Sequence, residues 1–285
     1  MPVSTDVMVQ CALDMAGMRQ LPGDSAVYVP GDGIRRLLVA LDVGPAELLL
    51  ARELGCDGVL AHHPAGGDAV VHFVDVLARH VDLMVEHGVP REEAKAAIAP
   101  LVRRLTLQHH AQNYEQTPAV ARLLGLPFLN LHLPLDEVGR RVIAETIERH
   151  CASLGREPLV QDVLDALLMI PEFATAPMPP MVPVGAVDRP AGRIAVVHGA
   201  GTNGGAAVAR AYFAHGVGTV LYLHLAPAEL EALRDARGNV VVMGHLPGDL
   251  VGINRYLTVL AEYDVEIVRL IGVEAGTSAP QVPAH

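Results

Sequence analysis

Two histidine-bearing segments, far apart in the chain, carry the residue types that bind transition metals. His62 and His63 follow one short apolar run, and His245 follows another, with Asp249 four residues further on. Both runs read as buried strands, and in open α/β sheets ligands collect beyond the carboxyl ends of the strands. If a helix begins just after Gly244, residues i and i+4 share a face. We therefore predict that these side chains converge on one site.

A further carboxylate, Glu115, follows the predicted strand at residues 105–108, and we place it in the same predicted set. Imidazole and carboxylate ligands together suit Zn, Mn or Fe better than Ca or Mg. Two such cations, bridged by a carboxylate, can convert a water to hydroxide. Each side chain has an alternative interpretation. His62 and His63 would be a surface pair, Asp249 a helix cap and Glu115 a solvated glutamate.

Alternating strands and helices would position these residues. In the first half we predict strands at 35–42, 58–61 and 105–108, and helices at 45–54, 73–86, 92–101 and 118–124. In the second half we predict strands at 193–197, 218–223, 240–243 and 265–271, and helices at 206–213, 228–237 and 250–261. This alternation favours βαβ units with mainly parallel pairing. The predicted fold is α/β, with two similar lobes around a central cleft.

The predicted organisation is an N-terminal lobe at 1–126, a connector at 127–190 and a C-terminal lobe at 191–285. The connector contains predicted helices at 137–151 and 160–168, then a segment rich in Pro and Met. Since proline lacks an amide donor, that segment is expected to be extended rather than a central strand. A helix–Gly–strand–His pattern at 54–62 recurs at 215–224, which indicates an internal duplication.

Bulk properties narrow the function classes. The chain has 285 residues, is 51% hydrophobic and has a net charge of −11. Nucleic-acid binding needs clustered Lys and Arg, so a nucleic-acid partner is not expected. The three cysteines are far apart and predict free thiols. The first residues do not resemble a signal peptide, and no apolar run is long enough to span a membrane, so we expect a cytoplasmic protein.

The runs Leu38-Val39-Ala40-Leu41-Asp42 and Glu53-Leu54-Gly55-Cys56-Asp57-Gly58-Val59-Leu60-Ala61-His62-His63-Pro64 together resemble the N-terminal signature of the Nif-three-like family. Its members are also labelled type 2 GTP cyclohydrolase I homologues. Gly199-Ala200-Gly201 and Gly244-His245-Leu246-Pro247-Gly248-Asp249 resemble its C-terminal signature. The resemblance covers the chain except for about residues 126–190.

The resemblance implies two α/β lobes around a cavity, two divalent metal ions and a homo-oligomer, a hexamer. The family's His-His pair falls on His62 and His63, and its late His on His245. Its late Glu falls on Asp249. The middle motif aligns at 111–115, which puts its ligating carboxylate at Glu115 and loses its His.

We interpret the chain as a dinuclear metal-dependent hydrolase of a small, possibly nucleotide-like substrate, as the label for GTP ring opening suggests. The alternative is a metal-containing scaffold or regulator that acts through protein partners. The catalytic residues are not identified; His224 and His110 are the acid/base candidates, and either could be a polar rim residue. The Gly-rich turn 199–205 could hold an anion with its amides or could simply need glycine to turn.

Overall fold

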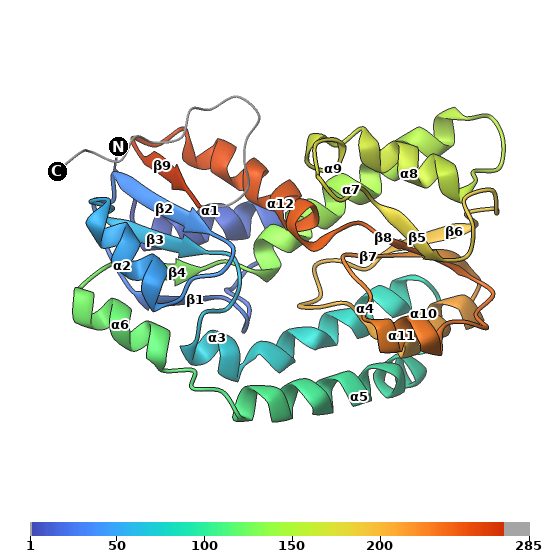
Figure 1. Ribbon diagram of the computed structural model, residues 1–285, viewed down its shortest axis with the longest axis horizontal. Coiled ribbons are helices and arrows are strands. Elements are labelled where there is room, and N and C mark those ends of the chain that lie inside the picture. The colour runs from blue at the N-terminus through green and yellow to red at the C-terminus, as the bar shows by residue number, and fades with distance from the viewer. Residues whose placement is uncertain (1, 271–285) are drawn as a thin grey trace. The chain divides into compact units, whose positions relative to one another are not determined.

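The chain folds into two compact α/β units, and the computed structural model describes residues 2–270 (Figure 1). Unit 1 comprises residues 1–73, 109–135 and 255–285, and unit 2 comprises residues 74–108 and 136–254. The chain therefore passes between the units four times. The predicted boundaries at 126/127 and 190/191 do not coincide with these four crossings.

Unit 1 contains a five-stranded sheet in the order β1-β4-β3-β2-β9. β1 is antiparallel to β4, and all other pairs are parallel. Its strands are β1 (Ala26–Val29), β2 (Arg36–Ala40), β3 (Gly58–Ala61), β4 (Phe128–Asn130) and β9 (Glu266–Arg269). Its helices include α1 (Thr5–Ala16), α2 (Pro45–Glu53), α3 (Gly67–Val71) and α6 (Gln116–Leu124). The 3-10 helix η1 (Phe73–Leu77) begins at Phe73, where the chain passes from unit 1 to unit 2.

Unit 2 contains a four-stranded sheet in the order β5-β8-β7-β6, with β5 antiparallel to β8 and the other pairs parallel. Its strands are β5 (Met181–Val184), β6 (Arg193–Val196), β7 (Val217–Tyr222) and β8 (Asn239–Val242). Its helices are α4 (Ala78–Glu86), α8 (Val160–Leu168), α9 (Pro171–Ala174), α10 (Gly205–Ala214) and α11 (Pro227–Ala232). Most of α5 (Arg91–His110) and of α7 (Leu133–Ser153), and the start of α12 (His245–Leu260), also belong to it.

The two sheets share one topology. Numbered along the chain within each unit, both have the strand order 1-4-3-2, with an antiparallel first strand at the edge; β9 extends only the first sheet. This shared order supports the duplication that the sequence indicated. It also means that the ends of β3 and β4 in unit 1 have the same positions in the sheet as the ends of β7 and β8 in unit 2.

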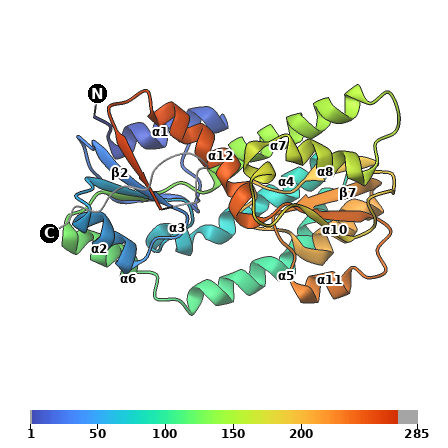
Figure 2. The same ribbon diagram turned by 45° about the horizontal axis from the view of Figure 1, so that its top comes forward.

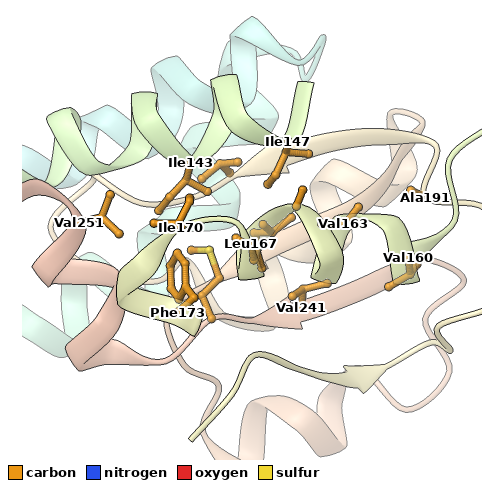
Figure 3. Packing of buried hydrophobic residues seen from close by; sticks show 14 residues of the cluster. Ile143, Ile147, Val160, Val163, Leu167, Ile170, Phe173, Ala191, Val241 and Val251 are labelled. Atoms are coloured by element: carbon orange, nitrogen blue, oxygen red, sulfur yellow. The ribbon is translucent and has the colours of Figure 1, made fainter. Parts of the chain in front are cut away.

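The core of unit 2 lies between its sheet and the pair α7 and α8. Figures 1 and 2 show these helices on one face of the sheet and α10 on the other. Ile143 of α7 and Leu167 of α8 pack with Val241 of β8 in one buried cluster (Figure 3). Burial of such side chains contributes about 1.5–3 kcal/mol each. Among residues 2–270, none of the helices combines the length and the apolar character of a membrane span.

Two sequence predictions about elements were wrong. Residues 105–108 are not a strand but part of α5, because the surrounding run is rich in helix-forming residues. Residues 266–269 form β9, which joins the sheet of unit 1 rather than that of the second half; Ile271 lies outside the described residues. The predicted connector contributes β4, α7, α8, α9 and β5 to the two units. Its Pro183 is tolerated because β5 is an edge strand.

Candidate metal centre

The fourth strand of each sheet is followed by the same motif. Residues 132–139 and residues 245–252 both read His-Leu-Pro-x-Asp-x-Val-Gly. The first copy follows β4 and opens α7, and the second follows β8 and opens α12. Each copy thus presents an imidazole and, four residues later, a carboxylate at a helix start beyond a strand end. The duplication therefore extends from the fold to its potential metal ligands.

Unit 1 gathers three imidazoles, those of His62, His63 and His132. Each offers a ring nitrogen within 4.8 Å of those offered by the other two. His62 and His63 follow β3, and His132 follows the neighbouring parallel strand β4. Adjacent strand ends meet at one edge of the sheet, which brings these side chains together. His62 and His132 are buried, and His63 is partly exposed.

Hydrogen bonds fix the tautomer of each ring. His62 Nδ1 lies 3.0 Å from the carbonyl oxygen of Leu131, which can only accept. His63 Nδ1 lies 2.8 Å from a carboxylate oxygen of Asp42, and His132 Nδ1 lies 2.8 Å from one of Asp24. In each ring Nδ1 therefore carries the hydrogen, so that in the neutral ring Nε2 carries the lone pair. An imidazole that donates its other N–H to oxygen is the usual arrangement of a metal ligand.

The loops around this cluster are tightly held. Asn130, at the end of β4, accepts from the hydroxyl of Tyr28 at 2.7 Å and donates to the carbonyl oxygen of Asp24 at 2.8 Å. The same Tyr28 hydroxyl accepts from the amide of Ala65, just after the histidine pair. Gly66 has φ +147, and a Cβ there would lie 2.3 Å from the Tyr114 carbonyl oxygen. The close approach that pins this loop requires glycine.

Unit 2 pairs the second predicted imidazole with its carboxylate. The helix α12 begins at His245, as expected, and His245 Nε2 lies 3.2 Å from Asp249 Oδ2. The ring of His224, which follows β7, lies 5.2 Å from that of His245 between centroids. Partial burial lowers the pKa of His224, and the neighbouring His245 lowers it further. The predicted acid/base candidate is thus beside a predicted ligand.

Asp136, in the first copy of the motif, lies close to Asp249 in the second. Their carboxylates offer oxygens within 4.8 Å of one another, and both side chains are buried. His198, which follows β6, is also buried, with its Nε2 3.7 Å from Asp136 Oδ1. Two buried carboxylates so close together favour a cation between them, because like charges in a low dielectric repel strongly.

The two remaining predicted residues have other surroundings. Glu115 is exposed at the start of α6, where its Oε2 accepts from Arg122 at 2.6 Å. It belongs to none of the groups within 2–270 that could hold a metal ion. His110 is exposed at the end of α5. The Gly-rich turn leads into α10, and there Glu229 accepts from the amide of Ala206 at 2.6 Å. A carboxylate of the chain itself thus occupies that helix start.

Sequence reasoning missed His132, Asp136 and His198. The first two were hidden because residues 127–190 were interpreted as a connector. The repeated His-Leu-Pro-x-Asp-x-Val-Gly pattern would have revealed them, since it aligns His132 with His245 and Asp136 with Asp249. His198 directly follows the predicted strand at 193–197, which is the same signal that identified His62.

Fold and site define a class: a duplicated α/β protein with His/Asp clusters that could bind metal ions. A scan against protein-family models found no match, and neither did a search of curated proteins. Solved structures do match. A NIF3 superfamily protein from Sphaerobacter thermophilus is 60% identical, with a TM-score of 0.94 over 96% of this chain and 100% of that one. The chain therefore belongs to the NIF3 superfamily, as its sequence resemblance predicted.

More distant structures share the fold alone. Reduced HcgD from Methanocaldococcus jannaschii is 13% identical, with a TM-score of 0.59 over 95% of this chain and 98% of that one. The protein SA1388 from Staphylococcus aureus is 11% identical, with a TM-score of 0.51 over 94% of this chain and 96% of that one. The two-unit fold thus persists at identities too low to transfer a function.

Proposed function

We propose that the protein is a metal-dependent hydrolase of a small substrate. The observation that carries this proposal is the cluster of three imidazoles whose Nδ1 atoms all face oxygen acceptors. In the neutral form of such rings Nε2 carries the lone pair, and neutral imidazole nitrogen suits Zn, Mn or Fe. The proposed ligands are His62, His63, His132, Asp136, His245 and Asp249.

Imidazoles together with carboxylates form a donor set that would hold divalent metal ions. When bound, the metals would activate a water as nucleophile and polarise the bond to be cleaved. The residues of the chain do the rest. Asp24 and Asp42 accept from the Nδ1 atoms of His132 and His63 and so orient the two rings. His224, beside His245, is the group we propose to move a proton, because an imidazole can serve as acid and base near neutral pH.

Metal analysis of matched variants tests the ligand set. Asp249→Asn and Asp136→Asn keep the side-chain volume but remove the charge, so both should lower the metal content of purified protein, with metal affinity falling at least about 10- to 100-fold. Asp165→Asn is the matched control, since Asp165 accepts from Gln161 one turn before it on α8. Unchanged metal content in both ligand variants would refute the ligand assignment.

An activity screen separates the hydrolase from the alternative scaffold. The protein, loaded with the metal that it retains, should hydrolyse small ester or cyclic substrates, and His224→Gln should lower kcat while leaving metal content unchanged. Full metal loading without turnover of any substrate would instead favour a metal-containing scaffold that acts through protein partners. The shared dinuclear centre, the choice among Zn, Mn and Fe and the homohexamer remain predictions from the sequence.

A further inference from the structure

We propose that an arginine cluster in unit 2 binds the phosphate group of the substrate. The cluster consists of Arg79 on α4 and of Arg140 and Arg141 on α7. It surrounds one carboxylate, that of Glu137, which directly follows Asp136. The assignment to a substrate rests on the function proposed above, but the binding of an anion does not.

Three guanidinium groups share this single buried carboxylate. Arg140 donates from Nε and Nη2 to the two oxygens of Glu137, both at 2.7 Å. Arg79 Nη2 donates to the same carboxylate at 3.2 Å, and Arg141 Nε lies 3.3 Å from it. The side chain of Glu137 is 7% exposed.

Glu137 does not satisfy every N–H group of the cluster. The Nε of Arg79 is enclosed, and among the described residues it has no acceptor. Glu86 contributes a second negative charge near Arg140. The side chains of Arg79 and Arg141 are 27% and 40% exposed, so a ligand from solvent can reach them.

The chemistry of the cluster selects an oxyanion. Guanidinium groups present forked N–H donors that match the oxygens of phosphate, and they are the preferred partners of phosphate in proteins. The glycine-rich turn closes one side, because a Cβ on Gly199 would lie 3.2 Å from Glu137 Oε2. Glu137 directly follows Asp136 on α7, so the carboxylate that the cluster surrounds lies on the same helix as a proposed metal ligand. We infer that the substrate is a small phosphorylated molecule.

The internal repeat argues against a purely structural role for the arginines. The second copy of the motif has Leu250 where the first has Glu137, and Ile253 and Asn254 where the first has Arg140 and Arg141. α12 forms without these charges. A helix of this repeat therefore forms with neither the carboxylate nor the arginines.

Titration with inorganic phosphate tests the cluster without the metals. Calorimetry on chelator-treated full-length protein, at ionic strength fixed with chloride, should detect phosphate binding and no acetate binding. Arg141→Gln and Arg79→Gln should each weaken it about tenfold or more, the loss expected for one charge-assisted hydrogen bond. The matched control is Arg234→Gln, because Arg234 is an exposed arginine that pairs only with Glu231 three residues before it.

Glu137→Gln distinguishes a ligand site from a structural clamp. If the buried carboxylate competes with the ligand, its removal should tighten phosphate binding severalfold even though the folded protein loses an ion pair. No gain in affinity with Glu137→Gln, together with no loss in either arginine variant, would overturn the proposal. Phosphate binding without hydrolysis of any phosphorylated substrate would refute the proposed hydrolase function and leave the anion site intact.

Discussion

The two copies of the His-Leu-Pro-x-Asp-x-Val-Gly motif have the same place in the fold but different surroundings. In the first copy, His132 is buried and its Nδ1 bonds to Asp24, whose side chain is fully buried. In the second copy, the side chain of His245 is 48% exposed, and it pairs with Asp249 of its own copy. The repeat thus presents the same residue types twice, with one imidazole held in a buried setting and the other accessible.

This difference suggests that the two copies of the motif have different roles. A ring held by a buried carboxylate has little freedom, and its ligand nitrogen is positioned before a metal arrives, which lowers the ordering cost of binding. The His245 ring is exposed and lies next to His224, so its surroundings can change when substrate enters. We therefore expect the first copy to hold the metal and the second copy to face the chemistry.

The largest expected effect comes from metal removal, which tests whether both copies take part. A bound metal should stabilise the fold by about 4 kcal/mol when free metal is a thousand times its dissociation constant. Protons compete for ligating imidazoles, and free imidazole titrates near 6.5. A chelator should therefore lower the melting temperature clearly at pH 7.5 and change it little at pH 5. A melting temperature indifferent to verified metal removal at pH 7.5 would mean that neither copy couples the metal to folding.

The strand and helix that position the second copy of the motif, at His245, could be predicted from the sequence. Those that position the first copy, at His132, could not. β8 is a run of Val after Asn239, and Gly244 marks its end, so His245 was found at a helix start. β4 has three residues, too short for a periodicity to emerge, and the helix after it was predicted to start at 137 instead of 133. The ligands of the first copy therefore fell inside a presumed connector, and Glu115 was aligned with the middle motif in their place.

Long-range pairing was the other part that local patterns could not supply. β9 lies beside β2, and the edge strand β5 pairs with β8 despite Pro183. Such choices depend on which surface is left to be buried, a property of the assembled sheet rather than of the segment. The strand expected at 105–108 failed for the same reason, because four residues of alternating pattern do not outweigh a twenty-residue helix.

A buried histidine of unit 2 should make stability depend on acid. Burial lowers the pKa of His80 on α4 from 6.5 to about 4, and only the backbone of Thr202 offsets this. Between pH 6.5 and about 4, the His80 ring is therefore protonated in the unfolded chain and neutral in the folded chain. The neutral His80 ring contributes fully to the free energy of unfolding above pH 6.5. This contribution, about 3 kcal/mol in all, is lost as the pH falls toward 4.

The variant His80→Leu isolates this effect. Its stability relative to the natural chain should rise by about 2–3 kcal/mol between pH 7.5 and pH 4.5, as measured by urea unfolding of metal-free protein. His110→Leu, at an exposed histidine, is the control and should show no comparable change. Parallel pH profiles for the natural chain and His80→Leu would show that the buried ring is protonated in the folded state.

The smallest expected effect compares the two motif histidines directly. His132→Ala removes a donor from Asp24, whose side chain is fully buried, and should cost about 2 kcal/mol of unfolding free energy. His245→Ala removes a half-exposed ring and should cost less than about 1 kcal/mol. Urea unfolding of the metal-free variants measures both, since metal would otherwise stabilise each folded state unequally. Equal costs would mean that the two copies are alike in rigidity.

Because both variants also lose a proposed ligand, metal affinity should fall in both. The different roles proposed above for the two copies predict the larger loss of metal affinity for His132→Ala.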